Sequence, residues 1–498
     1  MRTTPSLLTA VLVALAMVPA AQARSTTVRT PQGTITTTPG KDGVRHITFR
    51  WGPVQIDPGQ NTISLAANGL KPPGPGWITK FAPNLTYVDG KVPRVDVIHL
   101  HHAVWVVSNR TDPIRPTWAA GEEKTVFAMP KGFGWRYRTP DQWILNHMIH
   151  NLTPVATKVF ITWKMDFIPL RAKAAQGMQE IKTQWLDVEG IKAYPVFDAL
   201  QGSGASGRYT FPDDNPNPYP DGIVRNQWTV DHDATLVGTA GHLHPGGLYT
   251  DLKLTRNGQT VEVFRSNARY FEPAGAVSWD VSMTATPQNW RVAVKKGDVL
   301  SVSGTYDTST TSWYEVMAIM PLAITMAPAG GADPFMTNTA VPGVLTHGHL
   351  PENNHHGGAP SAKLRDARKL PDGPRKRTVD ISQFVYGQGD LSATGPLARP
   401  PVVGTGQPLT FVNDDAGRDI FHTITACRTP CTATTGIAFP LANGRSVFDS
   451  GELGFGPAGF TAAANRKRWQ TPTDLTPGTY TYFCRIHPFM RGAFRVKG

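Results

Sequence analysis

The feature that most constrains this chain is the alternation of apolar and polar residues in short segments bounded by Pro and Gly. The pattern is clear in 95–107 (VDVIHLHHAVWVV), 157–168 (TKVFITWKMDFI), 299–306 (VLSVSGTY) and 479–484 (TYTYFC). A period of two residues is typical of β-strands, and the 43 Pro and 48 Gly residues that recur between such segments are typical of turns. The sequence therefore predicts an all-β protein built from antiparallel sandwiches or barrels. Only 171–181 (RAKAAQGMQEI) has a helical composition.

Length and composition predict several domains. A chain of 498 residues is too long for one hydrophobic core. The segment 329–377 is rich in Pro, Gly, Asn and charge and lacks apolar periodicity, which is typical of a linker partly draped over a domain. The region before residue 329 is expected to divide near residue 185. The predicted units are a signal peptide at 1–23, a first β-sandwich at 24–185, a second at 186–328, the linker at 329–377 and a compact β domain at 378–498.

The beginning of the chain predicts export. Arg2 supplies a positive charge, an apolar run follows at 7–18, and Ala21 and Ala23 form a small-residue cleavage site. The run is too short to span a bilayer. The next most apolar stretch, 316–326, is about half a span and is expected to be a buried strand. We therefore expect a secreted or periplasmic protein with no stable membrane insertion.

The net charge of +12 does not by itself indicate a nucleic-acid partner. The Lys and Arg residues are mostly scattered, and the one dense run lies in the linker at 369–377. No nucleic-acid motif accompanies that run. A solvated basic surface is the prediction, and contact with an acidic cell surface is left open.

The chain contains three cysteines. Cys427 and Cys431, in CRTPC, are the plausible disulfide pair for an exported protein. Cys484 is then left over, and a lone thiol in an oxidising compartment needs protection. A metal ion would provide it.

The surroundings of Cys484 predict which metal. It is followed by His487 and Met490 in YFCRIHPFMRG, and His422, in RDIFHTIT, is the only other histidine of the C-terminal domain. A thiolate, two imidazoles and a weak thioether are the donors of a blue-copper site. The alternative is a buried, apolar Cys484 with His487 on the surface.

The segment 478–496 (GTYTYFCRIHPFMRGAFRV) resembles the end of cupredoxins, the plastocyanin-like domains. The resemblance covers the C-terminal domain and implies a cupredoxin β-sandwich. It also implies a type 1 copper held by His422, Cys484, His487 and Met490.

Histidines also cluster in the large region, in HLHHAVW, NHMIHN and GHLHPGG. These clusters contain His99, His101, His102, His147, His150, His242 and His244. On a regular strand His242 and His244 face one way, whereas His101 and His102 would need a bulged strand to share an ion. His99 with His101 is the easier pair on plain geometry. No Asp or Glu lies inside the motifs, which favours copper over structural zinc. Neutral histidines in the core or on the surface are the alternative.

The order of these motifs, followed by a methionine in SWYEVMAIM, resembles the copper type II, ascorbate-dependent monooxygenases. This is the peptidylglycine α-hydroxylating and dopamine β-monooxygenase family. The resemblance implies two tandem, jelly-roll-like β-sandwiches that each hold a type 2-like copper. It implies one copper bound by His101, His102 and His150. It implies a second, catalytic copper, where O2 binds, held by His242, His244 and Met317, with Met320 as the fallback for the thioether.

The chain departs from that family in its substrate region. Ala240 stands where peptide-hydroxylating members have an arginine, and Ile319 and Pro321 replace polar residues after the methionine. The large region also has no cysteine. A C-terminal glycyl peptide is therefore not the expected substrate.

Together the motifs and the resemblance to these families imply an exported copper-dependent monooxygenase-like oxidoreductase that hydroxylates a C–H bond of an unknown small organic substrate with O2. The blue-copper domain would relay electrons, supplementing or replacing ascorbate or another external donor. The alternative is a non-catalytic copper-binding, electron-transfer protein on the same scaffold. The linker histidines His347, His349, His355 and His356 are more typical of loose metal capture, or of no role, than of a specific site.

Overall fold

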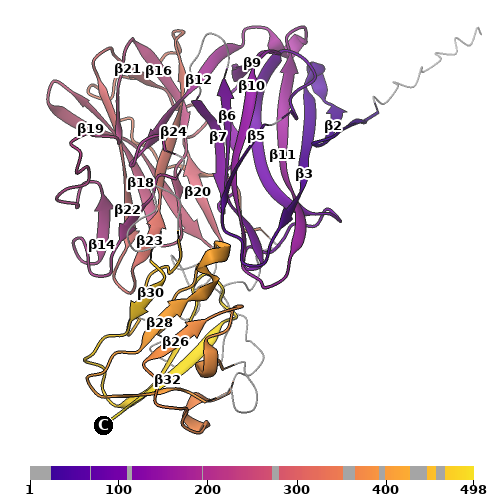
Figure 1. Ribbon diagram of the computed structural model, residues 1–498. Helices are drawn as coiled ribbons and strands as arrows, with labels where there is room; N and C mark the ends of the chain where they lie inside the picture. The colour runs from indigo at the N-terminus through magenta and orange to yellow at the C-terminus, as the bar shows by residue number, and fades with distance from the viewer. Residues whose placement is uncertain are drawn as a thin grey trace, which may run out of the picture.

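The computed structural model describes residues 24–67, 69–108, 115–192, 194–271, 280–350, 365–391, 399–426, 446–455 and 466–498. Regular structure in these ranges is β-strand with short 3-10 helices, which confirms the all-β prediction (Figure 1). No helix in the same ranges is long and apolar enough to cross a membrane. The helix expected over 171–181 is wrong. The short 3-10 turn η2 (Lys173–Ala175) is followed by Gly177 with φ +72° and by a strand from Gln179.

The first sandwich packs a four-stranded sheet against one half of a long sheet. The four strands are, in spatial order, β4 (Ile63–Ala67), β10 (Gln142–Asn151), β6 (Ile98–Ser108) and β7 (Arg115–Gly121). The long sheet begins with β1 (Thr26–Thr30), β2 (Gly33–Pro39), β3 (Arg45–Ile56), β11 (Thr157–Pro169), β5 (Gly76–Tyr87) and β9 (Phe133–Tyr137), and β8 (Phe127–Ala128) pairs with β5. Aromatic rings fill the space between the two sheets. Phe81 of the long sheet lies 4.8 Å from Trp105 of β6, centroid to centroid.

The long sheet continues into the second sandwich. Its remaining strands are β12 (Gln179–Asp187), β24 (Ala318–Thr325), β16 (Ala234–Thr239) and β21 (Val292–Val294), with β17 (His242–Leu243) on β24. β12 pairs in parallel with β9 and antiparallel with β24, so it belongs to both halves. The domain boundary predicted at residue 185 falls inside this shared strand. The expected buried strand within 316–326 is confirmed, because every residue of β24 is buried.

The rest of the second sandwich covers this half of the long sheet. Its larger sheet consists of β14 (Arg208–Phe211), β22 (Val299–Asp307), β18 (Gly247–Arg256), β19 (Gln259–Tyr270), β20 (Val281–Ala285) and β25 (Val344–Leu345), with β15 (Gln227–Thr229) on β22. A two-stranded sheet joins β13 (Phe197–Ala199) to β23 (Trp313–Val316). β25 belongs to the predicted linker, which therefore adds a strand to this sandwich.

The C-terminal sandwich lies at one end of the two larger ones (Figure 1). One sheet has β26 (Thr378–Ile381), β28 (Thr410–Asn413) and β30 (Arg468–Gln470). The other has β27 (Val402–Gly404), β32 (Arg491–Lys497), β31 (Gly478–Phe483) and β29 (Thr425–Ala426). Phe411, Tyr482 and Phe494 form the centre of the core of this C-terminal sandwich, and all three are fully buried.

The described residues also contain other short 3-10 helices. They are η1 (Lys41–Gly43) in the first sandwich, and η5 (Ala367–Lys369), η6 (Gly387–Gly389) and η8 (Asp414–Arg418) in the C-terminal part of the chain.

Candidate metal centre

Three of the predicted copper ligands converge at the end of the C-terminal sandwich that faces the large region. Cys484 directly follows β31, His487 lies in the turn toward β32, and His422 precedes β29. The Cys484 Sγ lies 3.9 Å from Nδ1 of each histidine, and the two Nδ1 atoms are 3.3 Å apart. Among the described residues this is the only group of three or more His, Cys, Asp or Glu side chains whose donor atoms all lie within 4.8 Å of one another.

Backbone hydrogen bonds shape the turn that carries the ligands. The Met490 N–H donates to the His487 carbonyl oxygen at 2.9 Å, and the Cys484 N–H donates to the Met490 carbonyl oxygen at 3.3 Å. Met490 is thereby buried in the same apolar cluster as Cys484. The N–H groups of Thr423 and His487 each lie 3.3 Å from the Cys484 Sγ. Donors aimed at sulfur favour the thiolate.

The electrostatics of the site also favour a thiolate. Burial raises the pKa of the Cys484 thiol, but hydrogen bonds from His422 and His487 outweigh it and hold that pKa well below its usual value. Burial lowers the pKa of His422, yet Asp415 and Cys484 raise it overall. His422 Nε2 donates to the Asp415 carboxylate at 3.0 Å, which leaves Nδ1 directed at the sulfur.

This donor set fits copper. A thiolate and a thioether are soft ligands that suit Cu(I), and imidazole suits both oxidation states. His422, Cys484 and His487 are fully buried, and Met490 is only 2% exposed, so water is excluded from the site. Asp415 was not singled out in the sequence, because a carboxylate seven residues before a histidine carries no recognisable signal.

The ligand turn is also the surface by which the C-terminal sandwich contacts the large region. The ring of His487 meets that of His150 edge to face, with centroids 5.9 Å apart. The Arg485 guanidinium donates to the Ser312 carbonyl oxygen at 2.8 Å and lies 5.1 Å from the ring centroid of Trp313. Both sandwiches of the large region therefore touch residues next to Cys484.

Imidazole rings continue from that contact into the large region. His150 and His99 have ring centroids 4.9 Å apart, and His99 and His101 are 6.3 Å apart. His101 then meets His244 at 4.9 Å, and His244 meets His242 at 5.4 Å. This histidine row, defined as the rings from His487 to His242, links the cysteine site to the middle of the large region.

Strand β6 contains a β-bulge at the first of two adjacent histidines that face different pockets. Pairing with β10 passes from His102–Met148 to Leu100–Ile149, so His101 is the extra residue. His101 lines a cavity of about 90 Å³ where all three sandwiches meet. His102 lines a separate cavity of about 360 Å³ inside the large region.

The two ligand sets implied for the large region are divided between these cavities. His150 and His244 line the smaller one with His101, whereas His242 and Met317 line the larger one with His102. Met320 lies in the apolar core of the second sandwich and borders neither cavity. Each cavity is therefore lined by residues from both of the implied copper sets, and neither cavity contains a complete set.

Carboxylates that the sequence motifs lack reach the histidines from elsewhere. Glu123 Oε2 lies 3.1 Å from His242 Nδ1, and Glu122 Oε1 lies 3.6 Å from His99 Nε2. Burial and then Glu123 raise the pKa of Glu122 well above its usual value, whereas His242 outweighs burial and lowers the pKa of Glu123. Gly121 makes this approach possible, because a Cβ there would lie 2.6 Å from the His242 ring. The two acids follow β7 in the chain, so only the fold places them here.

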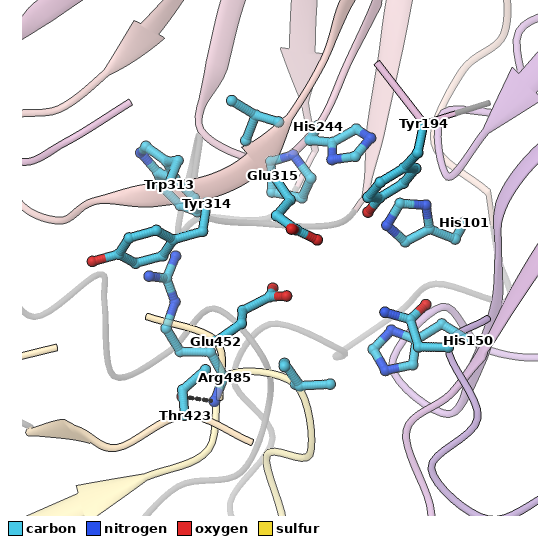
Figure 2. Close-up of a pocket in the computed structure, with 14 residues that line it drawn as sticks. His101, His150, Tyr194, His244, Trp313, Tyr314, Glu315, Thr423, Glu452 and Arg485 are labelled. Atoms are coloured by element: carbon cyan, nitrogen blue, oxygen red, sulfur yellow. Dashed lines mark hydrogen bonds between the residues drawn. The ribbon is translucent and has the colours of Figure 1, made fainter. Parts of the chain in front are cut away.

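The smaller cavity also contains acids and a tyrosine (Figure 2). Glu315 comes from β23, Glu452 from the C-terminal sandwich and Tyr194 from the segment after β12. Burial raises the pKa of Glu452 to about 8. Glu315 lies two residues before Met317 in SWYEVMAIM, but only the methionine of that motif was singled out in the sequence. Tyr194 and Glu452 belong to none of the motifs.

Some of the predicted features involve the linker or lie outside the described residues. The His347 ring contacts the Glu123 carbonyl oxygen and the His349 ring contacts the Asp280 carboxylate, so both rings already have protein partners. The segment 1–23, the pair Cys427 and Cys431, and His355 and His356 lie outside the residues that the structure describes.

No family model matches the chain, and no curated protein matches it. Solved structures give weak likenesses. An amicyanin mutant aligns with 28% of this chain and 99% of its own, at 18% identity and a TM-score of 0.15. A copper-containing nitrite reductase from Thermus scotoductus aligns with 53% of this chain and 55% of its own, at 15% identity and a TM-score of 0.15. An oxalate decarboxylase from Bacillus subtilis aligns with 60% of this chain and 74% of its own, at 7% identity and a TM-score of 0.15. TM-scores this low do not establish a shared fold.

Proposed function

We propose that this chain is an exported copper-dependent oxidoreductase whose C-terminal domain is a cupredoxin that relays electrons to the large region. The ligands of its type 1 copper would be His422, Cys484, His487 and Met490. Copper in such a donor set supplies one-electron transfer with little change in geometry. The observation that carries the proposal is the ring contact of His487 with His150, at a centroid separation of 5.9 Å.

The residues around the copper ligands hold this contact in place. Arg485 fastens the ligand turn to Ser312 and Trp313 of the second sandwich. Gly59 of the first sandwich approaches His487 so closely that a Cβ would lie 3.2 Å from Nε2. The Nε2 edge of the His487 ring therefore faces protein and not solvent. This is expected of a copper ligand that passes electrons to another part of the same chain.

For the large region we propose O2-dependent hydroxylation of a C–H bond in a small organic substrate, with ascorbate or another reductant as the external electron donor. The cavity of about 360 Å³ supports this proposal. His102, His242 and Met317 border it, and most of its other lining residues are apolar. A thioether beside imidazoles favours Cu(I), and an apolar cavity of this size suits a small organic molecule.

A second candidate function is electron transfer without turnover. It is favoured by the division of the implied ligand sets between two cavities. It is also favoured because, among the described residues, only the cysteine site has three metal-binding side chains already converged. Oxygen uptake that is coupled to a hydroxylated product would separate the two candidates.

The relay is tested by the rate at which the reduced, copper-loaded protein recovers its blue absorption on mixing with O2. His150→Phe keeps a buried ring but removes both nitrogens. We expect the blue band to be unchanged and its recovery to slow about tenfold or more, equivalent to at least ~1.4 kcal/mol in the barrier. His147→Phe is the matched control, because His147 is also buried on β10 but its ring contacts Trp51 instead. Equal recovery rates in both variants would refute a relay through His150.

A further inference from the structure

We propose that the cavity where the three sandwiches meet is a metal site of its own, for a divalent transition-metal ion. Its ligands are imidazoles of the large region together with carboxylates from the second and C-terminal sandwiches. The ligand residues are His101, His150, His244, Glu315 and Glu452. This grouping takes histidines from both of the copper sets that the sequence implies and adds two acids that belong to neither.

Imidazole nitrogens in this cavity are buried and lack hydrogen-bond partners among the described residues. His150 is 3% exposed, and neither of its ring nitrogens has a hydrogen-bond partner among the described residues. His101 Nδ1 and His244 Nε2 are likewise buried without a partner there. A buried nitrogen without a partner destabilises the folded chain, so several in one cavity call for a ligand.

Two carboxylates reach the same cavity as these histidines. Figure 2 shows the side chains of Glu315 and Glu452 pointing toward one another in the cavity, with His101 and His150 on one side. Glu315 has φ +53°, a backbone conformation that a glutamate adopts only under constraint. It lies in a bulge, since Asp198 of β13 opposes both Tyr314 and Glu315. The bulge directs the Glu315 side chain into the cavity.

Glu452 ties this cavity to the cysteine site. The next residue, Leu453, exchanges two backbone hydrogen bonds with His422, at 2.8 and 3.1 Å. An ion bound by Glu452 and by histidines of the large region would therefore join the C-terminal sandwich to the other two. It would also lie beside His150, the ring that contacts His487.

The donor types define the kind of ion. Imidazole nitrogens with carboxylate oxygens suit Cu(II), Zn(II), Fe(II) or Mn(II), whereas the sulfur ligands of the neighbouring site suit Cu(I). No three of these side chains have donor atoms that all lie within 4.8 Å of one another, unlike those of the cysteine site. Binding therefore requires the side chains to draw inward around the ion, and glutamate side chains are long enough to do so.

The test counts metal ions on the full chain. The protein is stripped with a chelator, loaded separately with Cu²⁺ and with Zn²⁺, and dialysed, and bound metal is measured. The blue absorption counts the cysteine site independently. We expect Glu452→Gln and His101→Gln each to hold one ion fewer than the unmodified chain, with the blue band unchanged after copper loading. His147→Gln, which alters a buried histidine outside this cavity, should hold the full number.

Electron paramagnetic resonance of the copper-loaded protein provides a second readout. We expect an axial copper signal with nitrogen and oxygen ligands, separate from the blue signal, that is absent from Glu452→Gln. Equal metal counts and equal spectra in the unmodified chain, Glu452→Gln and His101→Gln would overturn the proposal. Oxygen turnover plays no part in either measurement. The chain would therefore still bind this ion if the large region had no oxygenase activity. Conversely, a variant that loses this ion would keep the blue copper signal.

Discussion

Replacing Asp415 by asparagine should weaken metal binding at the cysteine site while preserving side-chain size. The carboxylate accepts three hydrogen bonds, from the Gln383 N–H at 2.9 Å, the Phe384 N–H at 3.2 Å and His422 Nε2 at 3.0 Å. An amide has one acceptor oxygen. In its better orientation the oxygen keeps Phe384 and His422, and the NH2 group then opposes the Gln383 N–H.

That orientation leaves one buried donor unsatisfied, which should lower the free energy of unfolding by about 1–3 kcal/mol. It also removes the charge that orients His422, and loss of such a partner typically lowers metal affinity about 10–100-fold, or ~1.4–2.7 kcal/mol. The assay is competition for copper with a chelator, followed by the blue absorption, together with thermal unfolding. Asp414→Asn is the control, because this exposed neighbour carries the same charge without contacting the histidine. A dissociation constant for Asp415→Asn within twofold of the control would refute the reasoning.

Two further substitutions test the large region. Tyr306 is buried, donates its hydroxyl hydrogen to the Met317 carbonyl oxygen and accepts from the His244 N–H. Tyr306→Phe should therefore lower the free energy of unfolding by about 2 kcal/mol, measured by urea titration of the metal-free chain, and equal midpoints would count against it. Burial raises the pKa of Asp333, but hydrogen bonds led by that from Arg256 outweigh it and lower the pKa to about 2. A depressed pKa contributes stability above pH 4 that is lost as the pH falls toward 2. Asp333→Asn should thus be less stable than the parent by about 1–2 kcal/mol at pH 7 and equally stable near pH 2, whereas a constant difference would show that the ion pair is not responsible.

The parts of the molecule that the sequence predicts best are those that local rules determine. The alternation over 299–306 and the apolar run within 316–326 both become strands, because a strand needs no more than its own side-chain period. Cys484 and His487 converge, and Met490 is buried in the same apolar cluster as Cys484, because the three share one tight turn of seven consecutive residues. The helical composition of 171–181 does not produce a helix, because Gly177 has φ +72° and residues 179–181 pair with the distant strand β9.

The grouping of the large-region histidines could not be predicted, because it depends on which distant elements of the chain surround β6. In an unbulged β6, His99 and His101 would face the same side and His102 the other. The bulge at His101 arises from the register with β10, and no property of the HLHH motif specifies that register. His101 and His102 serve different cavities, as adjacent residues of an unbulged strand also would. The motif does not specify which cavities these are: His101 faces the junction with the C-terminal sandwich, and His102 faces the apolar cavity beside Met317. Strand β6 therefore carries rings that face both cavities, whereas His150, the ring that contacts His487, belongs to β10. If that arrangement is functional, shifting the register of β6 by one residue should separate electron delivery from substrate binding even when every histidine is retained.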